Sequence, residues 1–102
     1  MTFKELQTKV IQNAVNYGEK YNIKIDEDFA LFKLFEEVGE LAQAILVHRR
    51  KSRPEKRMSR QASKQKVAEE LADVIGMVMV NADLLGIDLE DALDKKWIDK
   101  KN

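Results

Sequence analysis

Turn-forming residues are scarce in this chain, which has four glycines and one proline among 102 residues. A β-sandwich or β-barrel needs many more, because each of its short strands ends in a turn. Apolar residues instead recur at three- and four-residue intervals, which is typical of amphipathic helices. The chain has no cysteine, so disulfides cannot compensate for a small core. We therefore predict one all-α domain over residues 1–102, an antiparallel bundle of about four helices that a homodimer or homotetramer completes.

Capping residues and stop signals predict where these helices lie. Thr2 and Glu5 have the spacing of a capping box at the start of the first helix. Asp26 or Asp28 can cap the second helix, Gly86 is a stop signal for the third helix, and Asp88 can cap the fourth. The expected helices span about residues 2–21, 29–50, 63–85 and 89–100. We interpret the polar, basic stretch at about 51–61, which contains Pro54, as a loop. The alternative is that the helices on either side extend into it.

Positive charge is concentrated between His48 and Lys66. The formal net charge of the chain is zero, but this segment contains nine basic residues and one acidic residue, Glu55. Such a segment could bind the phosphates of a nucleotide or of a nucleic acid, or it could be a solvated loop. It contains no aromatic residue for base stacking, which argues against a nucleic-acid partner.

Nothing in the sequence indicates a membrane-spanning or secreted protein. No apolar run approaches the 18 or so residues that a transmembrane helix needs. The first residues lack the apolar core of a signal peptide. The absence of cysteine fits a reducing compartment. We therefore expect a cytoplasmic protein without a membrane partner.

Two acidic motifs are interleaved with the apolar residues of the second and third predicted helices. One contains Glu37 and Glu40, and the other contains Glu70 and Asp73. Residues three apart are neighbours on a helix, so each motif can direct two carboxylates to one place. If the two helices pack antiparallel, four carboxylates can meet, and like charges at that distance need a cation. The alternative is that these are ordinary solvated acidic residues.

The types of ligand indicate which cation to expect. Carboxylate oxygens suit Mg²⁺, Mn²⁺ or Ca²⁺ better than zinc or copper. Mg²⁺ commonly takes further ligands from substrate phosphates, which favours phosphate chemistry. Di-iron carboxylate bundles need Glu-x-x-His motifs, whereas the single histidine, His48, follows Ile45 at that spacing. We predict Mg²⁺ as the cofactor, with Mn²⁺ as a possible substitute.

At these residues the sequence resembles the MazG-like, all-α nucleoside triphosphate pyrophosphohydrolases. The family pattern is Glu-Glu-x-x-Glu, a spacer and Glu-x-x-Asp, and here it begins at Glu36 and ends at Asp73. The later stretch from Leu85 to Lys96 is also similar to the family. Twenty-nine residues separate Glu40 from Glu70. This spacer is slightly longer than is usual in the family, and the basic segment accounts for the extra length.

The resemblance implies Mg²⁺-dependent hydrolysis of an NTP or dNTP between the α- and β-phosphates, which gives a monophosphate and pyrophosphate. Carried over by position, the metal ligands would be Glu37, Glu40, Glu70 and Asp73. Glu36 matches a further acidic position, and either Glu36 or Glu37 is expected to be the general base. Lys96, which resembles a family lysine, and Asn81, two turns after Asp73, are expected to contact the substrate. A solvated lysine and a polar position in an oligomer core are the alternatives for these two.

Two other functions remain open at this point. Phosphoribosyl-ATP pyrophosphohydrolase of histidine synthesis is similar in fold and in acidic motif, although the residues after Asp73 fit the MazG-like pattern better. The non-enzymatic alternative is a helical interaction module whose basic loop binds nucleic acid. That module would bind without releasing pyrophosphate.

Overall fold

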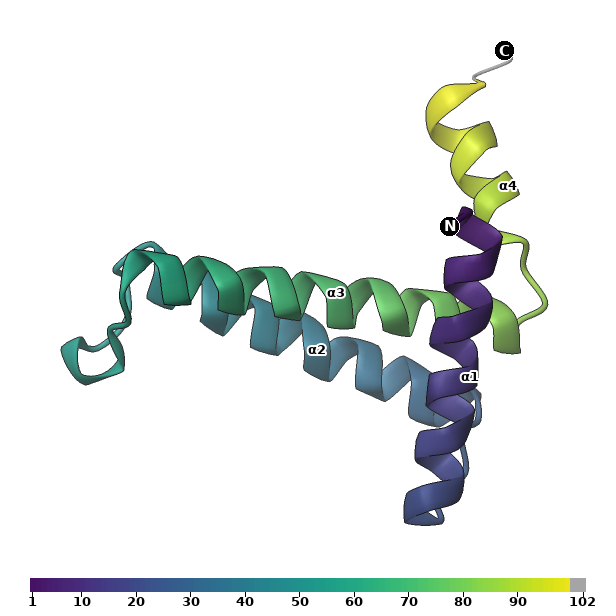
Figure 1. The fold of residues 1–102 in the computed structure, drawn as a ribbon, viewed down its shortest axis with the longest axis horizontal. Coiled ribbons are helices and arrows are strands. Elements are labelled where there is room, and N and C mark those ends of the chain that lie inside the picture. The colour runs from purple at the N-terminus through teal and green to yellow at the C-terminus, as the bar shows by residue number, and fades with distance from the viewer. Residues whose placement is uncertain (100–102) are drawn as a thin grey trace.

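The computed structural model describes residues 1–99, and these residues form helices without any strand (Figure 1). The α-helices are α1 (Phe3–Tyr21), α2 (Glu27–His48), α3 (Arg60–Leu84) and α4 (Leu89–Leu93). A short 3₁₀ turn, η1 (Pro54–Lys56), lies in the basic loop, and a π-helical turn, η2 (Asp94–Ile98), continues α4. The predicted all-α class with about four helices is confirmed.

Helices α2 and α3 pack antiparallel as a long arm, with the basic loop at its far end (Figure 1). Helix α1 crosses α3 steeply at the other end of the arm, and α4 points away from the arm there. The Nζ of Lys4 lies 2.6 Å from an Asp88 carboxylate oxygen, which ties the start of α1 to the cap of α4. The acidic motifs of α2 and α3 are therefore placed side by side.

Side-chain caps begin the four α-helices. The Thr2 hydroxyl accepts a hydrogen bond from the Glu5 N–H at 3.1 Å, as the capping box predicts. Asp26 caps α2 and Ser59 caps α3, so these helices begin two and three residues earlier than expected. Asp88 caps α4 as predicted. The basic loop is accordingly slightly shorter than expected at its C-terminal end.

Each of the three long helices is followed within two residues by a residue with a left-handed backbone, namely Asn22, Arg50 and Gly86. The Ile87 N–H, for example, donates to the Ala82 carbonyl at 2.8 Å, which is the Schellman arrangement. The fourth helix begins at Leu89 as expected, but it is not an α-helix throughout. Its α-helical part ends at Leu93, and a wider π-helical turn follows. Its expected end at Lys100 lies outside the described residues.

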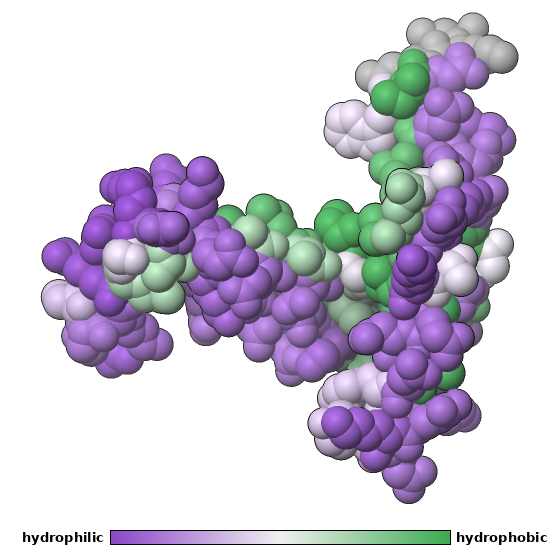
Figure 2. All heavy atoms as spheres, viewed as in Figure 1, coloured by the Kyte–Doolittle hydropathy of each residue, from purple (hydrophilic) through white to green (hydrophobic). Residues whose placement is uncertain are grey.

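The buried core of the single chain is small. Its buried apolar side chains are Ala30, Ala44, Met79, Val80 and Ala82. Alanines on α2 allow α3 to approach closely. Many larger apolar side chains are exposed, and Figure 2 shows them along the upper edge of the arm and in the angle between the arm and α4.

Gly18 allows the chain to fold back tightly after α1. A Cβ at this position would lie 2.8 Å from the Ile23 carbonyl oxygen and 2.7 Å from Ile25 Cγ1. Only glycine accommodates so close an approach, and Ile25 is thereby held against α1. No helix among the described residues is long and apolar enough to cross a membrane.

Candidate metal centre

Three carboxylates from the two acidic motifs converge between α2 and α3. Glu37, Glu70 and Asp73 each offer one oxygen, and these oxygens all lie within 4.8 Å of one another. Glu37 is seven residues from both Ala30 and Ala44, so it shares the buried face of α2 with them. Glu37 and Glu70 are only 7% and 5% exposed, whereas Asp73 is exposed. We call these three residues the carboxylate cluster.

Two buried oxygens of this cluster have no hydrogen-bond partner among the described residues. They are Oε2 of Glu37 and Oε2 of Glu70. A buried carboxylate oxygen without a partner is costly, and such atoms are rare unless an ion or water satisfies them. The cluster is also made only of oxygen ligands, which hard divalent cations prefer. The residues present therefore fit a divalent cation.

The electrostatics of the cluster also favour a cation. Burial, followed by the neighbouring carboxylates of Glu40 and Asp73, raises the pKa of Glu37 from its ordinary 4.5 to about 7. Lys33 opposes this rise, because its Nζ lies 3.8 Å from a Glu37 oxygen. On the other helix, Lys66 Nζ lies 3.1 Å from Glu70 Oε1. Each buried glutamate thus has one lysine partner and one free oxygen.

The other predicted acidic residues lie around the cluster. Glu40 is close enough to Glu37 to raise its pKa, but it is outside the compact group of three. The Glu36 side chain is 55% exposed, and its carboxylate pairs with Lys33 at 2.5 Å. Metal ligation by Glu40 and a catalytic role for Glu36 therefore stay predictions.

The two predicted substrate contacts have different surroundings. The amide of Asn81 donates to the carbonyls of Ala30 at 2.9 Å and Met77 at 2.7 Å, so it links α3 to α2. Its amide hydrogens are used in packing, which leaves Oδ1 for any substrate contact. Lys96 is exposed in η2 and lines neither of the cavities that flank the cluster. Substrate contact by either residue stays a prediction.

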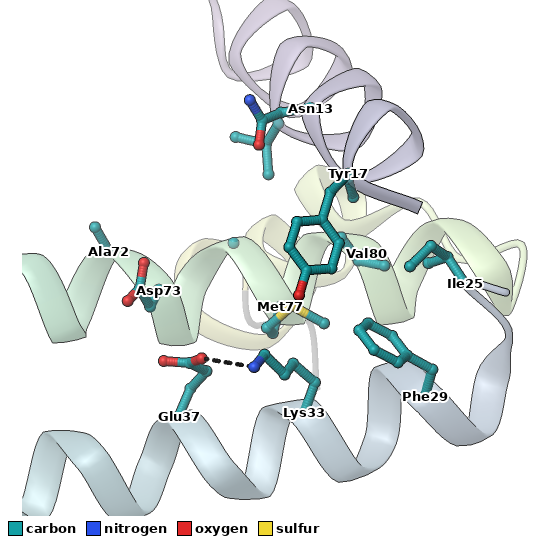
Figure 3. Close-up of a pocket in the computed structure, with 13 residues that line it drawn as sticks. Asn13, Tyr17, Ile25, Phe29, Lys33, Glu37, Ala72, Asp73, Met77 and Val80 are labelled. Atoms are coloured by element: carbon teal, nitrogen blue, oxygen red, sulfur yellow. Dashed lines mark ion pairs between the residues drawn. The ribbon is translucent and has the colours of Figure 1, made fainter. Parts of the chain in front are cut away.

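An apolar cavity of ≈ 370 Å³ lies between α1, α2 and α3 on one side of the cluster (Figure 3). The Tyr17 hydroxyl points from α1 toward α2 and α3, and the Phe29 ring lies nearby. Tyr17 is 42% exposed in the single chain. The residues lining this apolar cavity are Val10, Asn13, Ala14, Tyr17, Ile25, Phe29, Lys33, Glu37, Ala72, Asp73, Gly76, Met77 and Val80.

A second cavity, of ≈ 510 Å³, lies on the other side of the cluster, toward the basic loop. We call it the basic cavity, because the cations of Arg53, Lys56 and Lys66 line it. Its other lining residues are Glu40, Gln43, Ala44, Leu46, Val47, Ser52, Met58, Ser63 and Glu70.

The two lysines that pair with the buried glutamates were not predicted from the sequence. Lys33 precedes Glu37 by four residues, and Lys66 precedes Glu70 by four residues. This repeated Lys-x-x-x-Glu spacing was a readable signal, because residues four apart are neighbours on a helix. Ser52 and Asn13, by contrast, have no sequence signal that singles them out.

Comparison with known proteins relates this chain to a family. The model of the MazG nucleotide pyrophosphohydrolase domain matches residues 19–102, which include the whole carboxylate cluster. The chain belongs to the MazG family. It is also 45% identical over 62 residues to the uncharacterized protein YvdC of Bacillus subtilis (strain 168). That match covers 59% of this chain and 58% of YvdC. No solved structure matches the chain.

Proposed function

We propose that this MazG-family chain is a divalent-cation-dependent pyrophosphohydrolase that cleaves an NTP or dNTP between the α- and β-phosphates. The observation that carries the proposal is the pair of buried oxygens on Glu37 and Glu70 that have no hydrogen-bond partner among the described residues and that lie beside two open cavities. A purely structural pair of glutamates would be satisfied by protein groups. A cluster that receives a cation with its substrate leaves these oxygens free.

The residues of the cluster would hold Mg²⁺ or Mn²⁺, which would supply positive charge against the triphosphate and a more acidic water. In the reaction, the oxygen of water bonds to the α-phosphorus, and the bond from that phosphorus to the α–β bridging oxygen breaks. The bridging oxygen leaves with its electron pair as part of pyrophosphate, and a carboxylate accepts the proton of the water. Glu36 and Glu37 are the candidates for this base. Glu36 is exposed to solvent and outside the cluster, so a loss of turnover with unchanged cation binding in Glu36→Gln would favour it.

We further propose that the active form is a homodimer or homotetramer. Leu31, Phe35 and Val38 on α2 are all at least 44% exposed, and so are Leu71 and Ile75 on α3. At ~100° per residue, these side chains share the flank of the arm that faces away from Glu40 and Asp73. A second copy of the arm would cover this flank as a four-helix bundle and leave the carboxylates free. Sedimentation should therefore give an oligomer for the native chain and a smaller species for Phe35→Glu, with Gln65→Glu as the exposed control.

A pyrophosphate-release screen tests the proposed activity. It should cover all NTPs and dNTPs with Mg²⁺ and with Mn²⁺, and it should include phosphoribosyl-ATP. We expect release from at least one nucleoside triphosphate, loss of release in Glu70→Gln and retention in Glu69→Gln, whose side chain is exposed on the same helix. The absence of release from every nucleotide would overturn the proposal in favour of an interaction module.

A further inference from the structure

The carboxylate cluster lies between two cavities that differ in the number of cations in their lining. Glu37 and Asp73 line the apolar cavity, whereas Glu70 lines the basic cavity. Because the ligand oxygens of these three residues lie within 4.8 Å of one another, the two cavities meet at the cluster. An elongated substrate that is cleaved at the cluster would therefore extend into both cavities.

The apolar cavity has the character of a nucleoside site. The rings of Tyr17 and Phe29 can cover the face of a base, and the Asn13 amide can donate to or accept from its edge. The single cation in its lining, Lys33, already pairs with two glutamates. This cavity therefore offers little to the outer phosphates of a triphosphate.

The basic cavity has the character of a phosphate site. Lys56 and Arg53 project from the loop, and Lys66 comes from α3. Arg53 Nε lies 3.3 Å from a Glu55 oxygen, but both side chains are largely exposed, so this ion pair contributes little and can be exchanged. Arginine and lysine form their strongest hydrogen bonds with anionic oxygens such as those of phosphate.

Two buried polar atoms also lie at the basic cavity. Within the described residues, neither Ser52 Oγ nor Glu70 Oε2 has a hydrogen-bond partner. A hydroxyl can donate to a phosphate oxygen, and a carboxylate oxygen can bind the cation that accompanies it. These atoms therefore point to a ligand independently of the charge of the loop.

The ends of the basic loop are fixed beside this cavity. His48 Nδ1, at the end of α2, lies 2.7 Å from Ser63 Oγ on α3. Ser63 is 2% exposed and also donates to the Arg60 carbonyl at 3.1 Å. This contact joins the two ends of the loop at the far end of the arm, next to the cavity that Arg53 and Lys56 line (Figure 1).

We propose that the basic cavity is the pyrophosphate subsite, in which Arg53 and Lys56 bind the β- and γ-phosphates of the substrate. The nucleoside and its α-phosphate lie on the side of the apolar cavity. This proposal rests on the proposed function, and it adds a direction to the same reaction. When the bond between the α-phosphorus and the bridging oxygen breaks, pyrophosphate leaves on the side of the basic loop, and the monophosphate leaves on the side of α1.

Binding of inorganic pyrophosphate to the full chain in Mg²⁺ tests the subsite without turnover. Titration calorimetry should compare the native chain with Arg53→Ala/Lys56→Ala. We expect the double variant to bind pyrophosphate at least about tenfold more weakly. The matched control is Lys51→Ala/Arg57→Ala, which removes the same charge from exposed loop residues that do not line the cavity. It should remain within about twofold, and neither pair should change the affinity for a nucleoside monophosphate.

Each other outcome is decisive. Equal weakening in both double variants would overturn the subsite, because it would mean non-specific attraction to the loop. Salt-dependent binding of single-stranded DNA that both pairs lose equally would overturn it in favour of a nucleic-acid surface. If no nucleotide is hydrolysed but pyrophosphate binding depends on Arg53 and Lys56, the proposed function fails and the subsite stands. If hydrolysis occurs and pyrophosphate binding is insensitive to these residues, the subsite fails and the function stands.

Discussion

Replacement of Glu37 by glutamine should change how the stability of the cation-free protein depends on pH. The folded chain raises the pKa of this carboxyl from 4.5 to about 7, chiefly through burial. Below pH 4.5 the group is protonated in both the folded and the unfolded chain, so it costs nothing. As the pH rises from about 4.5 to about 7, the unfolded chain releases this proton first, and the folded state becomes less stable.

The size of this effect follows from the two pKa values. One pKa unit corresponds to ~1.4 kcal/mol, so the full penalty above pH 7 is at most about 3–4 kcal/mol. The cavity beside the cluster is open to solvent, and solvent screening reduces the expected loss to about 1–2 kcal/mol. Mg²⁺ at 100 times its Kd would return about 2.7 kcal/mol to the native chain.

Urea unfolding, followed by circular dichroism in a chelator, measures this loss at about pH 5 and about pH 8. Between about pH 5 and about pH 8, every protein has a measured loss of stability. We expect this loss to be about 1–2 kcal/mol larger in the native chain and in the Glu69→Gln control than in Glu37→Gln. At about pH 8, Mg²⁺ should restore the stability of the native chain, and it should have a smaller effect on the stability of Glu37→Gln. Equal pH dependence in all three proteins would refute the account of the cluster.

Three further substitutions, the first with a matched control, test how the fold holds the site. Gly18→Ala should lower the free energy of unfolding in the urea titration by about 1–2 kcal/mol, because its Cβ would meet the Ile23 carbonyl oxygen. Its control is Gly39→Ala, because nothing lies within 4 Å of a Cβ at that position. This control should leave the free energy of unfolding unchanged or raise it by up to about 1 kcal/mol. Asn81→Ala should cost about 1 kcal/mol of stability in the same titration, because two carbonyls lose a donor. If Asn81 Oδ1 also contacts the substrate, as predicted, kcat/KM should fall as well, and an unchanged kcat/KM would limit Asn81 to packing. Arg50→Gly should raise the thermal midpoint, because Arg50 has a left-handed backbone with φ of 59°, and a lowered midpoint would contradict this.

Much of the fold was predictable because its signals are local. The Thr2 capping box, the Gly86 stop and the periodic apolar residues each act within one or two helical turns. The starts of α2 and α3 were predicted late, since Asp26 and Ser59 cap these helices before the apolar pattern begins. The π-helical turn after Leu93 has no comparable sequence signature.

The site was partly predictable for the same reason. The spacing of Glu70 and Asp73 places two carboxylates together on one helix, and antiparallel packing brings Glu37 to them. The cavities were not predictable, because they depend on how α1 crosses the arm and on where the loop lies. Tyr17 and Ser52 acquire their positions only through that tertiary packing.

Direct measurement of cation binding tests the central claim, that the carboxylate cluster holds a divalent metal. Mn²⁺ can be titrated into the native chain and followed by electron paramagnetic resonance, with Glu70→Gln and the exposed control Glu69→Gln in parallel. We predict that the native chain and Glu69→Gln bind Mn²⁺ alike and that Mg²⁺ competes. Glu70→Gln should bind at least about tenfold more weakly, because it loses a buried anionic ligand. Undiminished Mn²⁺ binding by Glu70→Gln would contradict the account.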